Sequence, residues 1–302
     1  MISFRKSVRA AVIVGVLFFV FDAVVFHVLK GGMDRYYELD KAAKIVSVGH
    51  SHSVLGIDAQ QMEAALGVKV SKYATAGANT LDRWWMVRHF IGRQPDVEVV
   101  VYDVDPRLFD SEGLSSASYT LFLPYMDDPV MQKYMKQEAA WQEYYAGRVV
   151  RTSRFRDQTL NIALRGLLGK IENKKSSTMR LENYQGFLER EQERKIRINP
   201  AAVQCFQDTV QFLTDRGKTV VLVFIPVADL LNAIDPAAQA KVVQMFSDLA
   251  DTNEKVVFLD YNKDYHTRHE LFYDLRHLNA DGNALITNRL IQDLIPYLKL
   301  NT

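Results

Sequence analysis

Residues 44–53 read Lys-Ile-Val-Ser-Val-Gly-His-Ser-His-Ser, a largely apolar run that ends in a glycine and passes into polar residues. The run has the length and the β-branched content of a short buried strand. Ser51 follows Gly49 by two positions, which predicts a sharp turn from this strand into a helix, with the serine hydroxyl at the edge of the sheet. A serine that simply caps the next helix would fit the same pattern. The stretch therefore predicts an α/β fold and leaves the role of Ser51 open.

The rest of the chain repeats this alternation of short apolar runs and amphipathic stretches. The predicted strands are 44–49, 68–74, 97–103, 219–226 and 255–260. The predicted helices are 58–66, 80–92, 200–216, 236–249 and 281–298. Strands that alternate with helices predict a five-stranded parallel sheet covered on both faces, that is, a three-layer α/β/α sandwich. In such sheets the active site lies at the carboxyl ends of the strands.

The N-terminal segment predicts a membrane anchor. Residues 10–29 are apolar apart from Asp22 and His27, about the length needed to cross a bilayer, and three basic residues precede them. By the positive-inside rule, residues 1–30 form a cytoplasmic tail and a transmembrane helix, and the remainder of the chain is exported. A cleaved signal peptide is the alternative, but no small-x-small cleavage site follows the run. Asp22 is either tolerated by a long apolar run or faces a partner helix in the membrane.

Residues 31–302 are expected to form one domain with a long insertion after the third strand. The insertion spans residues 106–199 and contains no strong strand signal. Because a structureless loop of this length is uncommon, we expect a helical cap over the strand ends. Basic residues outnumber acidic ones between positions 148 and 197. This bias fits either a solvated surface with scattered ion pairs or a surface that contacts anionic headgroups or an anionic polymer.

A second motif, near the C-terminus, supplies the partners that a nucleophilic serine needs. Asp274 and His277 are three residues apart, before the last predicted helix. At this spacing their side chains can lie together, with the imidazole as general base for Ser51 and the carboxylate fixing its tautomer. The alternative is a capping group for the last helix, in which Asn279 or Asp281 is the N-cap. With both motifs present, we predict a catalytic triad of Ser51, His277 and Asp274.

Two residues after the second predicted strand are candidate oxyanion donors. Gly77 can offer an unobstructed backbone N–H, and Asn79 can offer a side-chain N–H. An ordinary strand-to-helix turn uses the same residue types, so the pattern fits either role. His50 and Asp105 lie at the same predicted edge and complete the candidate oxyanion and substrate-binding set.

Histidines and aspartates at this edge also allow a metal site. His50, His52, His277, Asp103 and Asp105 are of the residue types that bind the metal of a metallo-hydrolase. Against this, the two histidines that flank the serine are expected to alternate in direction, so that one of them points away. We therefore predict no metal and no other cofactor.

The overall composition excludes some classes of function. The formal net charge is +1 over 302 residues, so the chain is not an evident nucleic-acid binder, and we predict no nucleic-acid partner. Its single cysteine, Cys205, rules out an internal disulfide.

The order of the motifs resembles a known superfamily. Gly-x-Ser after the first strand, Gly-x-Asn after the second and Asp-x-x-His-Leu before the last helix are similar to the blocks of SGNH, or GDSL-like, hydrolases. Residues 48–58 and 100–109 look closer to a membrane-anchored bacterial branch. That branch includes DltD-like proteins and SGNH proteins that accompany membrane-bound O-acyltransferases. The resemblance covers roughly residues 44–110 and 200–298.

The resemblance implies a flavodoxin-like fold, the triad named above and Gly77 as an oxyanion donor. Two features depart from the family pattern. His50 stands where an acidic residue is usual before the serine. The Gly-x-Asn-Asp block usual after the third strand is replaced by Asp-Val-Asp at 103–105.

Two functions are consistent with these observations. The first is a membrane-anchored serine esterase or acyltransferase that acts on ester-linked acyl groups of an envelope polysaccharide or glycolipid. The second, suggested by the altered third block, is a catalytically silent accessory protein that binds a glycan or a membrane-bound O-acyltransferase partner.

Overall fold

Five strands form one fully parallel sheet in the computed structural model, which describes residues 2–110, 118–184, 188 and 195–298. The strands are β1 (Ile45–Gly49), β2 (Val70–Ala74), β3 (Val99–Val104), β4 (Thr219–Phe224) and β5 (Val256–Asp260). The expected five-stranded parallel sheet is confirmed, and each predicted strand overlaps an observed one. Their order, β2-β1-β3-β4-β5, is flavodoxin-like, and in that order the ligand crevice lies where β1 meets β3.

Contacts within the chain divide it into two units, which are described separately. The sheet unit comprises Glu38–Ser115 and Glu172–Thr302, and the helical unit comprises Met1–Tyr37 and Ser116–Ile171. The predicted boundaries place an anchor over 1–30 and the insertion within the sheet's domain. The contacts instead group residues 116–171 with the N-terminal helix.

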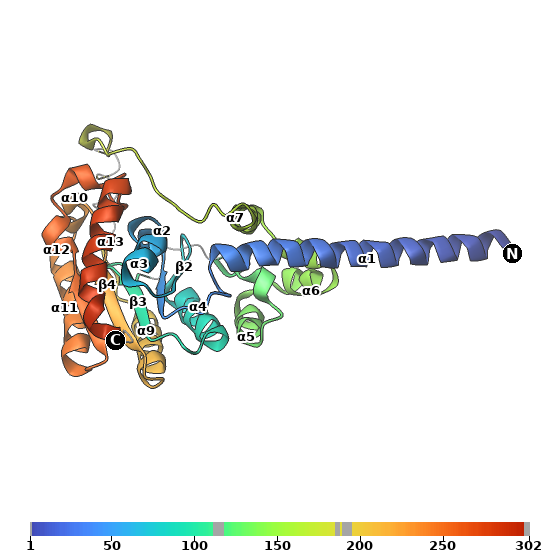
Figure 1. The fold of residues 1–302 in the computed structure, drawn as a ribbon, viewed down its shortest axis with the longest axis horizontal. Helices are drawn as coiled ribbons and strands as arrows, with labels where there is room; N and C mark the ends of the chain where they lie inside the picture. The colour runs from blue at the N-terminus through green and yellow to red at the C-terminus, as the bar shows by residue number, and fades with distance from the viewer. Residues whose placement is uncertain (1, 111–117, 185–187, 189–194, 299–302) are drawn as a thin grey trace. The chain divides into compact units, whose positions relative to one another are not determined.

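Helices cover both faces of the sheet, which confirms the three-layer sandwich (Figure 1). On one face lie α2 (Ser51–Gly56), α3 (Ala59–Leu66) and α13 (Ala280–Leu294). On the other lie α4 (Thr80–Arg93), α9 (Pro200–Thr214) and α11 (Pro236–Thr252). Shorter elements join them, namely α10 (Asp229–Asn232), α12 (Asn262–Tyr265) and the 3-10 turns η4 (Leu181–Asn183), η5 (His269–Leu271) and η6 (Ile295–Tyr297).

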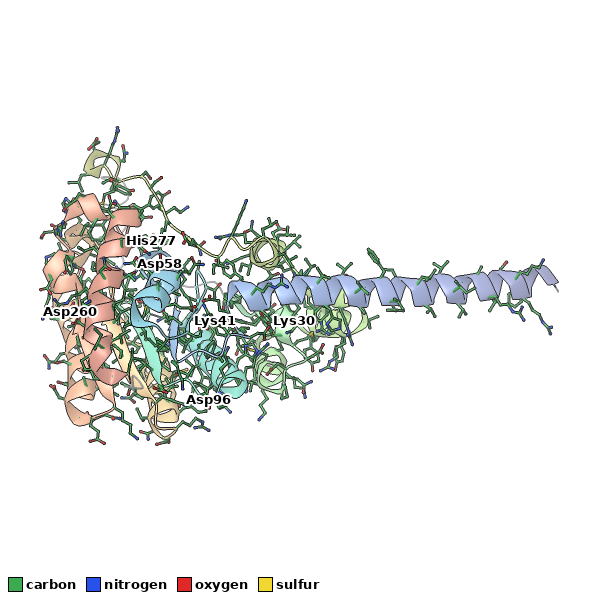
Figure 2. All side chains as sticks on the ribbon, viewed as in Figure 1. Lys30, Lys41, Asp58, Asp96, Asp260 and His277 are labelled. Atoms are coloured by element: carbon green, nitrogen blue, oxygen red, sulfur yellow. The ribbon has the colours of Figure 1, made fainter. Side chains whose placement is uncertain are left out.

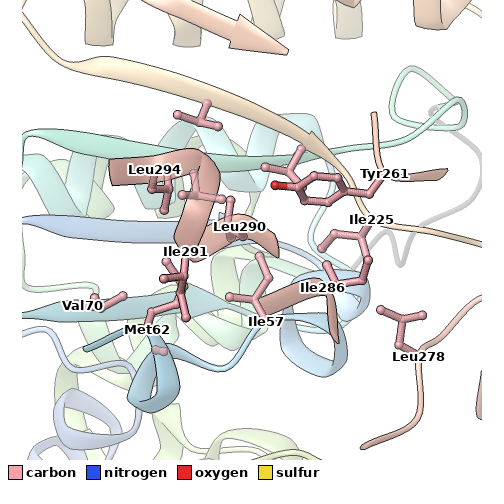
Figure 3. Close-up of a cluster of buried hydrophobic side chains, with 14 of the residues drawn as sticks. Ile57, Met62, Val70, Ile225, Tyr261, Leu278, Ile286, Leu290, Ile291 and Leu294 are labelled. Carbon is pink, nitrogen blue, oxygen red and sulfur yellow. The ribbon is translucent and has the colours of Figure 1, made fainter. Parts of the chain in front are cut away.

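Side chains along each strand alternate between the two faces of the sheet and fill the core on each face. Val99 and Val101 of β3 are fully buried in the cluster that contains Ile286 of α13, part of which is drawn in Figure 3. Tyr102 points to the opposite face, where its ring packs 5.7 Å from that of Phe206 on α9. Because successive strand residues face opposite layers, a strand buried on both sides reads as a continuous apolar run.

The helical unit is built around one long N-terminal helix, α1 (Ile2–Tyr36). The insertion adds η1 (Ser118–Leu121), η2 (Leu123–Tyr125), α5 (Pro129–Glu138), α6 (Trp141–Val149), η3 (Arg151–Arg154) and α7 (Asp157–Leu167). By length and composition, residues Phe4–Tyr36 of α1 are long and apolar enough to cross a membrane. In Figure 2 the side chains on the N-terminal half of α1 project from all sides of the helix.

Two glycines let α1 and α7 pack backbone against backbone. A Cβ at Gly32 would lie 2.2 Å from the carbonyl oxygen of Ala163, and a Cβ at Gly166 would lie 1.8 Å from the carbonyl oxygen of Gly32. Neither position has room for a larger residue without separating the helices. The contact therefore fixes α7 against the C-terminal part of α1.

Asp22 of α1 is satisfied by the chain's own insertion. Its carboxylate accepts hydrogen bonds from the backbone N–H of Arg151 at 2.8 Å and from the backbone N–H and hydroxyl of Thr152 at 2.9 and 2.5 Å. These donors belong to the first turn of η3, where backbone N–H groups lack helical acceptors. The alternative of a separate partner helix is therefore not needed to explain this aspartate.

The insertion is helical over only part of its predicted length. Its α-helices α5 to α7 lie between residues 129 and 167, whereas residues 170–180 form no helix. That polar segment pairs with the loop before α13 instead. The N–H of Met179 donates to the carbonyl of Phe272 at 2.8 Å, and the N–H of Ala280 donates to that of Lys175 at 2.7 Å. For residues 116–171, the expected position over the strand ends stays a prediction.

Candidate active site

The turn after β1 is held in a shape that only glycine permits at position 49. A Cβ at Gly49 would lie 2.2 Å from Oγ of Ser53 and 2.6 Å from Cβ of Asp103. The close approach lets α2 begin directly at Ser51, with His50 as its N-cap. Ser51 thus stands at the carboxyl end of β1, as the Gly-x-Ser motif predicts.

Asp103, at the end of β3, accepts hydrogen bonds from the start of α2. Its Oδ2 atom accepts hydrogen bonds from the backbone N–H groups of His50 and Ser53, at 3.3 and 3.2 Å. Asp103 is fully buried, and burial alone would raise its pKa. The charge of His50 and the hydrogen bond with its ring outweigh burial, so the pKa of Asp103 is lowered and it stays ionised.

A half-buried lysine holds the other end of α2. The ammonium group of Lys72 on β2 donates to the carbonyl oxygens of Ile57 and Val54, at 2.8 and 3.2 Å. A cation at this position satisfies carbonyls that end the helix and complements its dipole. Burial lowers the pKa of Lys72 to about 8. Both ends of the short helix that carries Ser51 are therefore fixed by charged groups.

The structure brings the three predicted triad residues together. The Nε2 atom of His277 lies 2.8 Å from Oγ of Ser51. Its Nδ1 atom lies 2.9 Å from both carboxylate oxygens of Asp274. One imidazole thus bridges the hydroxyl and the carboxylate, which is the geometry of a Ser-His-Asp triad. His277, labelled in Figure 2, comes from the loop that precedes α13.

Asp274 is oriented by its own loop. Its Oδ1 atom accepts hydrogen bonds from the backbone N–H groups of Arg276 and His277, at 2.8 and 2.9 Å. Burial would raise its pKa, but the hydrogen bond and charge of His277 lower the pKa overall. An ionised Asp274 holds the proton of His277 on Nδ1, which leaves Nε2 free to accept a proton from Ser51.

The start of α13 fixes the end of this loop. Asn279 is the N-cap, and its side-chain oxygen accepts from the N–H of Gly282 at 3.0 Å. Its amide nitrogen donates to the carbonyl of Glu270 at 2.7 Å. The capping alternative for this region is therefore confirmed at Asn279, and capping and the triad geometry coexist.

His50 is clamped between two carboxylates. Its Nδ1 lies 2.7 Å from Oδ2 of Asp103, and its Nε2 lies 3.1 Å from Oδ2 of Asp105. Burial would lower the pKa of His50, but the charge of Asp103 and the hydrogen bonds that the ring makes to both carboxylates raise it overall. The pKa of Asp105 is lowered in turn, since the hydrogen bond and charge of His50 outweigh burial. His50 and Asp105 thus form a charged pair beside the candidate nucleophile.

The expectation that one of the two flanking histidines points away is wrong. The rings of His50 and His52 lie 4.2 Å apart, and that of His52 lies 5.6 Å from His277. The chain is not extended here, because α2 already begins at Ser51. Burial, and then the charge of His50, lower the pKa of His52 to about 3, so its ring is neutral at ordinary pH.

The same packing bears on the metal alternative. Ligand atoms of His50, His52 and Asp103 all lie within 4.8 Å of one another, a spacing that would suit a metal ion. However, Nδ1 of His50 and Oδ2 of Asp103 are already bonded to each other, so a metal there would have to replace that bond. The prediction that the site uses no metal stays a prediction.

Gly77 and Asn79 occupy the turn after β2. Gly77 has a φ of +82°, a left-handed conformation that glycine adopts without strain. Asn79 is the N-cap of α4, and its side-chain oxygen accepts from the N–H of Asp82 at 2.9 Å while Asp82 accepts from the N–H of Asn79. Both residues thus have the roles expected in an ordinary strand-to-helix turn. Their roles as oxyanion donors stay predictions.

A pocket of about 180 Å³ opens at this edge of the sheet. Ser51, His277, His50, His52 and Asp105 line it, whereas Gly77 and Asn79 do not belong to its lining. Apolar side chains complete the wall, including Leu108, Ile196, Val227 and Leu231. The pocket therefore joins a reactive polar end to a small apolar chamber.

Three arginines at the pocket were not predicted from the sequence. Arg83 is buried, and its guanidinium donates to the backbone carbonyl of Asp103 at 2.6 Å. Arg107 and Arg276 also line the pocket. A lone arginine has no local sequence signal for such a position. The position of Arg276 beside His277 was the one available clue.

Neither a family model nor a curated protein matches the sequence. A search of solved structures finds TesA with a TM-score of 0.45 and 13% identity, over 84% of this chain and 99% of that one. A GDSL-like lipase from Bacteroides thetaiotaomicron has a TM-score of 0.42 and 9% identity, over 86% and 91% of the two chains.

A third similar structure is the C-terminal catalytic domain of the peptidoglycan O-acetyltransferase OatA from Streptococcus pneumoniae. It has a TM-score of 0.39 and 10% identity, over 84% of this chain and 94% of that domain. At these scores the likenesses assign this chain no family, substrate or partner. The SGNH, or GDSL-like, superfamily expected from the motifs and its anchored branch both stay predictions.

Proposed function

We propose that this protein is a membrane-anchored SGNH-type serine esterase or acyltransferase that acts on ester-linked acyl groups of an envelope polysaccharide or glycolipid. The single observation that supports it most is the imidazole of His277, which lies 2.8 Å from Oγ of Ser51 and 2.9 Å from Asp274. Capping or packing alone would not require a carboxylate, an imidazole and a hydroxyl in this order.

The proposed reaction proceeds through an acyl-enzyme. Oγ of Ser51 attacks the ester carbonyl while Nε2 of His277 takes its proton, and Asp274 stabilises the imidazolium. His277 then returns the proton to the leaving alcohol as the tetrahedral intermediate collapses. Water or a sugar hydroxyl attacks the acyl-serine, with His277 again as base, and restores the free hydroxyl. Water gives hydrolysis, and a sugar hydroxyl gives transfer.

The oxyanion is assigned to the backbone N–H of Ser51, whereas Gly77, which lies outside the pocket lining, is kept as a candidate second donor. Ser51 begins α2, where backbone N–H groups have no helical acceptor, which supports the assignment to Ser51. Removing one oxyanion donor typically costs about 3–4 kcal/mol of transition-state stabilisation. The Gly-x-Asn-Asp block that is usual after the third strand is absent here, and any oxyanion donor lost with it would slow acyl transfer.

The pocket supports a short acyl group. Its volume of about 180 Å³ lies below the roughly 300–1,000 Å³ of sites for drug-sized ligands. An acetyl group fits such a chamber, whereas a long fatty acyl chain would have to leave it. Arg107 and Arg276, which also line the pocket, suit a polar, oxygen-rich acceptor.

The alternative is an accessory protein that binds a glycan or a membrane-bound O-acyltransferase and performs no chemistry. The replacement of the third block by Asp-Val-Asp at 103–105 favours it. In this alternative the pair of half-buried His50 and buried Asp103 has a structural role only.

The two functions are separated by acetate release from an acetylated polysaccharide and from p-nitrophenyl acetate, with and without a glycan acceptor. The proposal expects release by the intact protein and its loss in Ser51→Ala. The matched control is Ser247→Ala on α11, which should retain wild-type rates. Equal rates for Ser51→Ala and wild type would refute the enzymatic proposal, and complementation of a deletion strain by Ser51→Ala would favour the accessory role.

A further inference from the structure

The helical unit carries apolar surface that no described residue covers. On α6, Trp141, Tyr145 and Val149 are 69%, 62% and 62% exposed and recur every four residues. On α7 and at its C-cap, the leucines at 160, 164 and 168 repeat the same spacing and are 39%, 47% and 68% exposed. Side chains four apart share one helix face, so each helix presents an apolar stripe. We call these six residues the interfacial surface.

The contact with Asp22 sets the depth of this surface along α1. Arg151 and Thr152, whose N–H groups bind Asp22, follow the end of α6 directly. Asp22 precedes the outer end of the apolar run, at residue 29, by seven residues, or about 10 Å of helix. Amphipathic helices that lie on a bilayer bury their apolar face about 5–10 Å into the boundary between headgroups and acyl chains. The C-terminal end of α6 is therefore at the depth of an interfacial helix.

The position of α7 agrees with this depth. Its backbone contact with α1 is at Gly32, three residues beyond the apolar run. The leucine stripe of α7 thus starts from the level of the headgroups. Both stripes belong to the same compact unit as the membrane-crossing segment.

The residue types on and around the surface suit a lipid boundary. Tryptophan and tyrosine are the side chains enriched at membrane interfaces, where an apolar ring meets a polar layer. Arg148, Arg151 and Arg156 are exposed beside the stripes, although Arg156 also pairs with Glu143. Arginines near the surface are attracted to anionic lipid headgroups.

The burial of Asp22 agrees with this depth. A charged group at this depth is costly unless the protein satisfies it. The first turn of η3 does so, and it can do so only where the insertion enters the same layer as α1. A contact of this kind explains why a polar residue interrupts the apolar run.

We propose that α6 and α7 lie in the outer interface of the membrane that α1 crosses, with the interfacial surface facing lipid. The helical unit is then a membrane-seated collar around the outer part of α1, and anionic headgroups are its polar contacts. This inference rests on the anchoring included in the proposed function, and it is independent of the chemistry at Ser51.

The test uses single cysteines labelled with the fluorophore NBD in full-length protein, reconstituted in phosphatidylcholine–phosphatidylglycerol vesicles. Cys205→Ser is the background, which removes the native thiol. Tyr145→Cys and Val149→Cys report the surface, Val12→Cys reports the hydrocarbon core, and Gln137→Cys on the exposed polar face of α5 is the aqueous control. Quenching is measured with lipids that carry a nitroxide near the headgroup or near the bilayer centre, and with aqueous iodide.

The proposal expects several-fold stronger quenching of the labels at 145 and 149 by shallow nitroxide lipid than of the label at 137. It also expects protection of both from iodide. Iodide quenching at 145 and 149 equal to that at 137, with position 12 still protected, would overturn the collar while leaving the anchor. A label at 12 open to iodide would overturn the anchor and the collar together. If neither the nitroxide lipids nor iodide quenched the labels at 145 and 149, a second copy of the protein would cover the surface. The lipid assignment would then fail.

Discussion

The Nε2 atom of His277 lies 2.8 Å from Oγ of Ser51, although 226 positions separate the two residues in the chain. The two side chains reach the same edge of the sheet from different elements, one at the start of α2 and one from the loop before α13. Asp103 and Lys72 hold α2 by hydrogen bonds, and Asn279 fixes the end of the loop as the N-cap of α13. The distance is thus set by buried or partly buried hydrogen bonds on both sides.

Substitution of Asp274 by Asn should lower kcat by about 10⁴-fold, because the wrong tautomer of His277 would be favoured. The free energy of unfolding should change little, since the loop N–H groups retain an acceptor. Initial rates on p-nitrophenyl acetate and urea unfolding measure the two effects. Asp281→Asn, in the first turn of α13, is the matched control and should keep wild-type kcat. Comparable rates for Asp274→Asn and wild type would remove Asp274 from the mechanism.

Gly49→Ala should destabilise the sheet unit and reduce activity, because the new Cβ would overlap Ser53 and Asp103. Overpacking of this kind costs about 1–3 kcal/mol. Gly92→Ala on α4 is the control, since nothing lies within 4 Å of a Cβ there and alanine favours a helix by up to about 1 kcal/mol. Denaturant titration should therefore give opposite signs for the two variants. A neutral Gly49→Ala would mean that the turn relaxes without moving Ser51.

The contribution of His50 to stability should depend on pH. Its folded-state pKa is raised above the unfolded value of about 6.5, so the stabilisation is fully present below that value. It should be lost as the pH rises through the folded-state pKa. The groups that face the ring are Asp103, Asp105, Arg83 and His52. Urea unfolding of wild type and His50→Gln between pH 5 and 9 tests this.

The difference in free energy of unfolding between the two proteins should shrink as the pH rises. Asp105→Asn is the second variant, and it should lower the pKa of His50, which NMR titration of the ring protons reports. A difference that grows with pH would show that His50 is neutral in the folded state.

Gly32→Ala should weaken the helical unit, because its Cβ would meet the backbone of α7. Gly31→Ala is a control one residue away, where a Cβ has no neighbour within 4 Å. Limited proteolysis in detergent should cleave the insertion of Gly32→Ala several-fold faster than that of Gly31→Ala. Equal cleavage would argue that α7 does not depend on this contact.

Local patterns sufficed for much of the fold and for the triad. Short apolar runs specified the strands because both faces of a parallel sheet are buried. Gly-x-Ser and Asp-x-x-His are each local motifs, so Ser51, Asp274 and His277 were identified without knowledge of the fold. Their mutual distances required the structure.

Contacts between distant segments could not be predicted in the same way. Arg83 is buried because α4 packs against the end of β3, and a lone arginine in a helix gives no sign of this. Asp22 finds its donors 129 and 130 residues away. The expectation that either His50 or His52 points away was wrong because it depended on where α2 begins. Each case was decided by tertiary packing.

The most direct test of the account is covalent trapping of the nucleophile with a fluorophosphonate, followed by mass spectrometry of the tryptic peptides. A Ser-His-Asp triad at this site predicts an adduct on Ser51 in the folded protein and a greatly slowed reaction in His277→Gln. A folded protein that gives no adduct on Ser51, or one that His277→Gln labels at the wild-type rate, would contradict it.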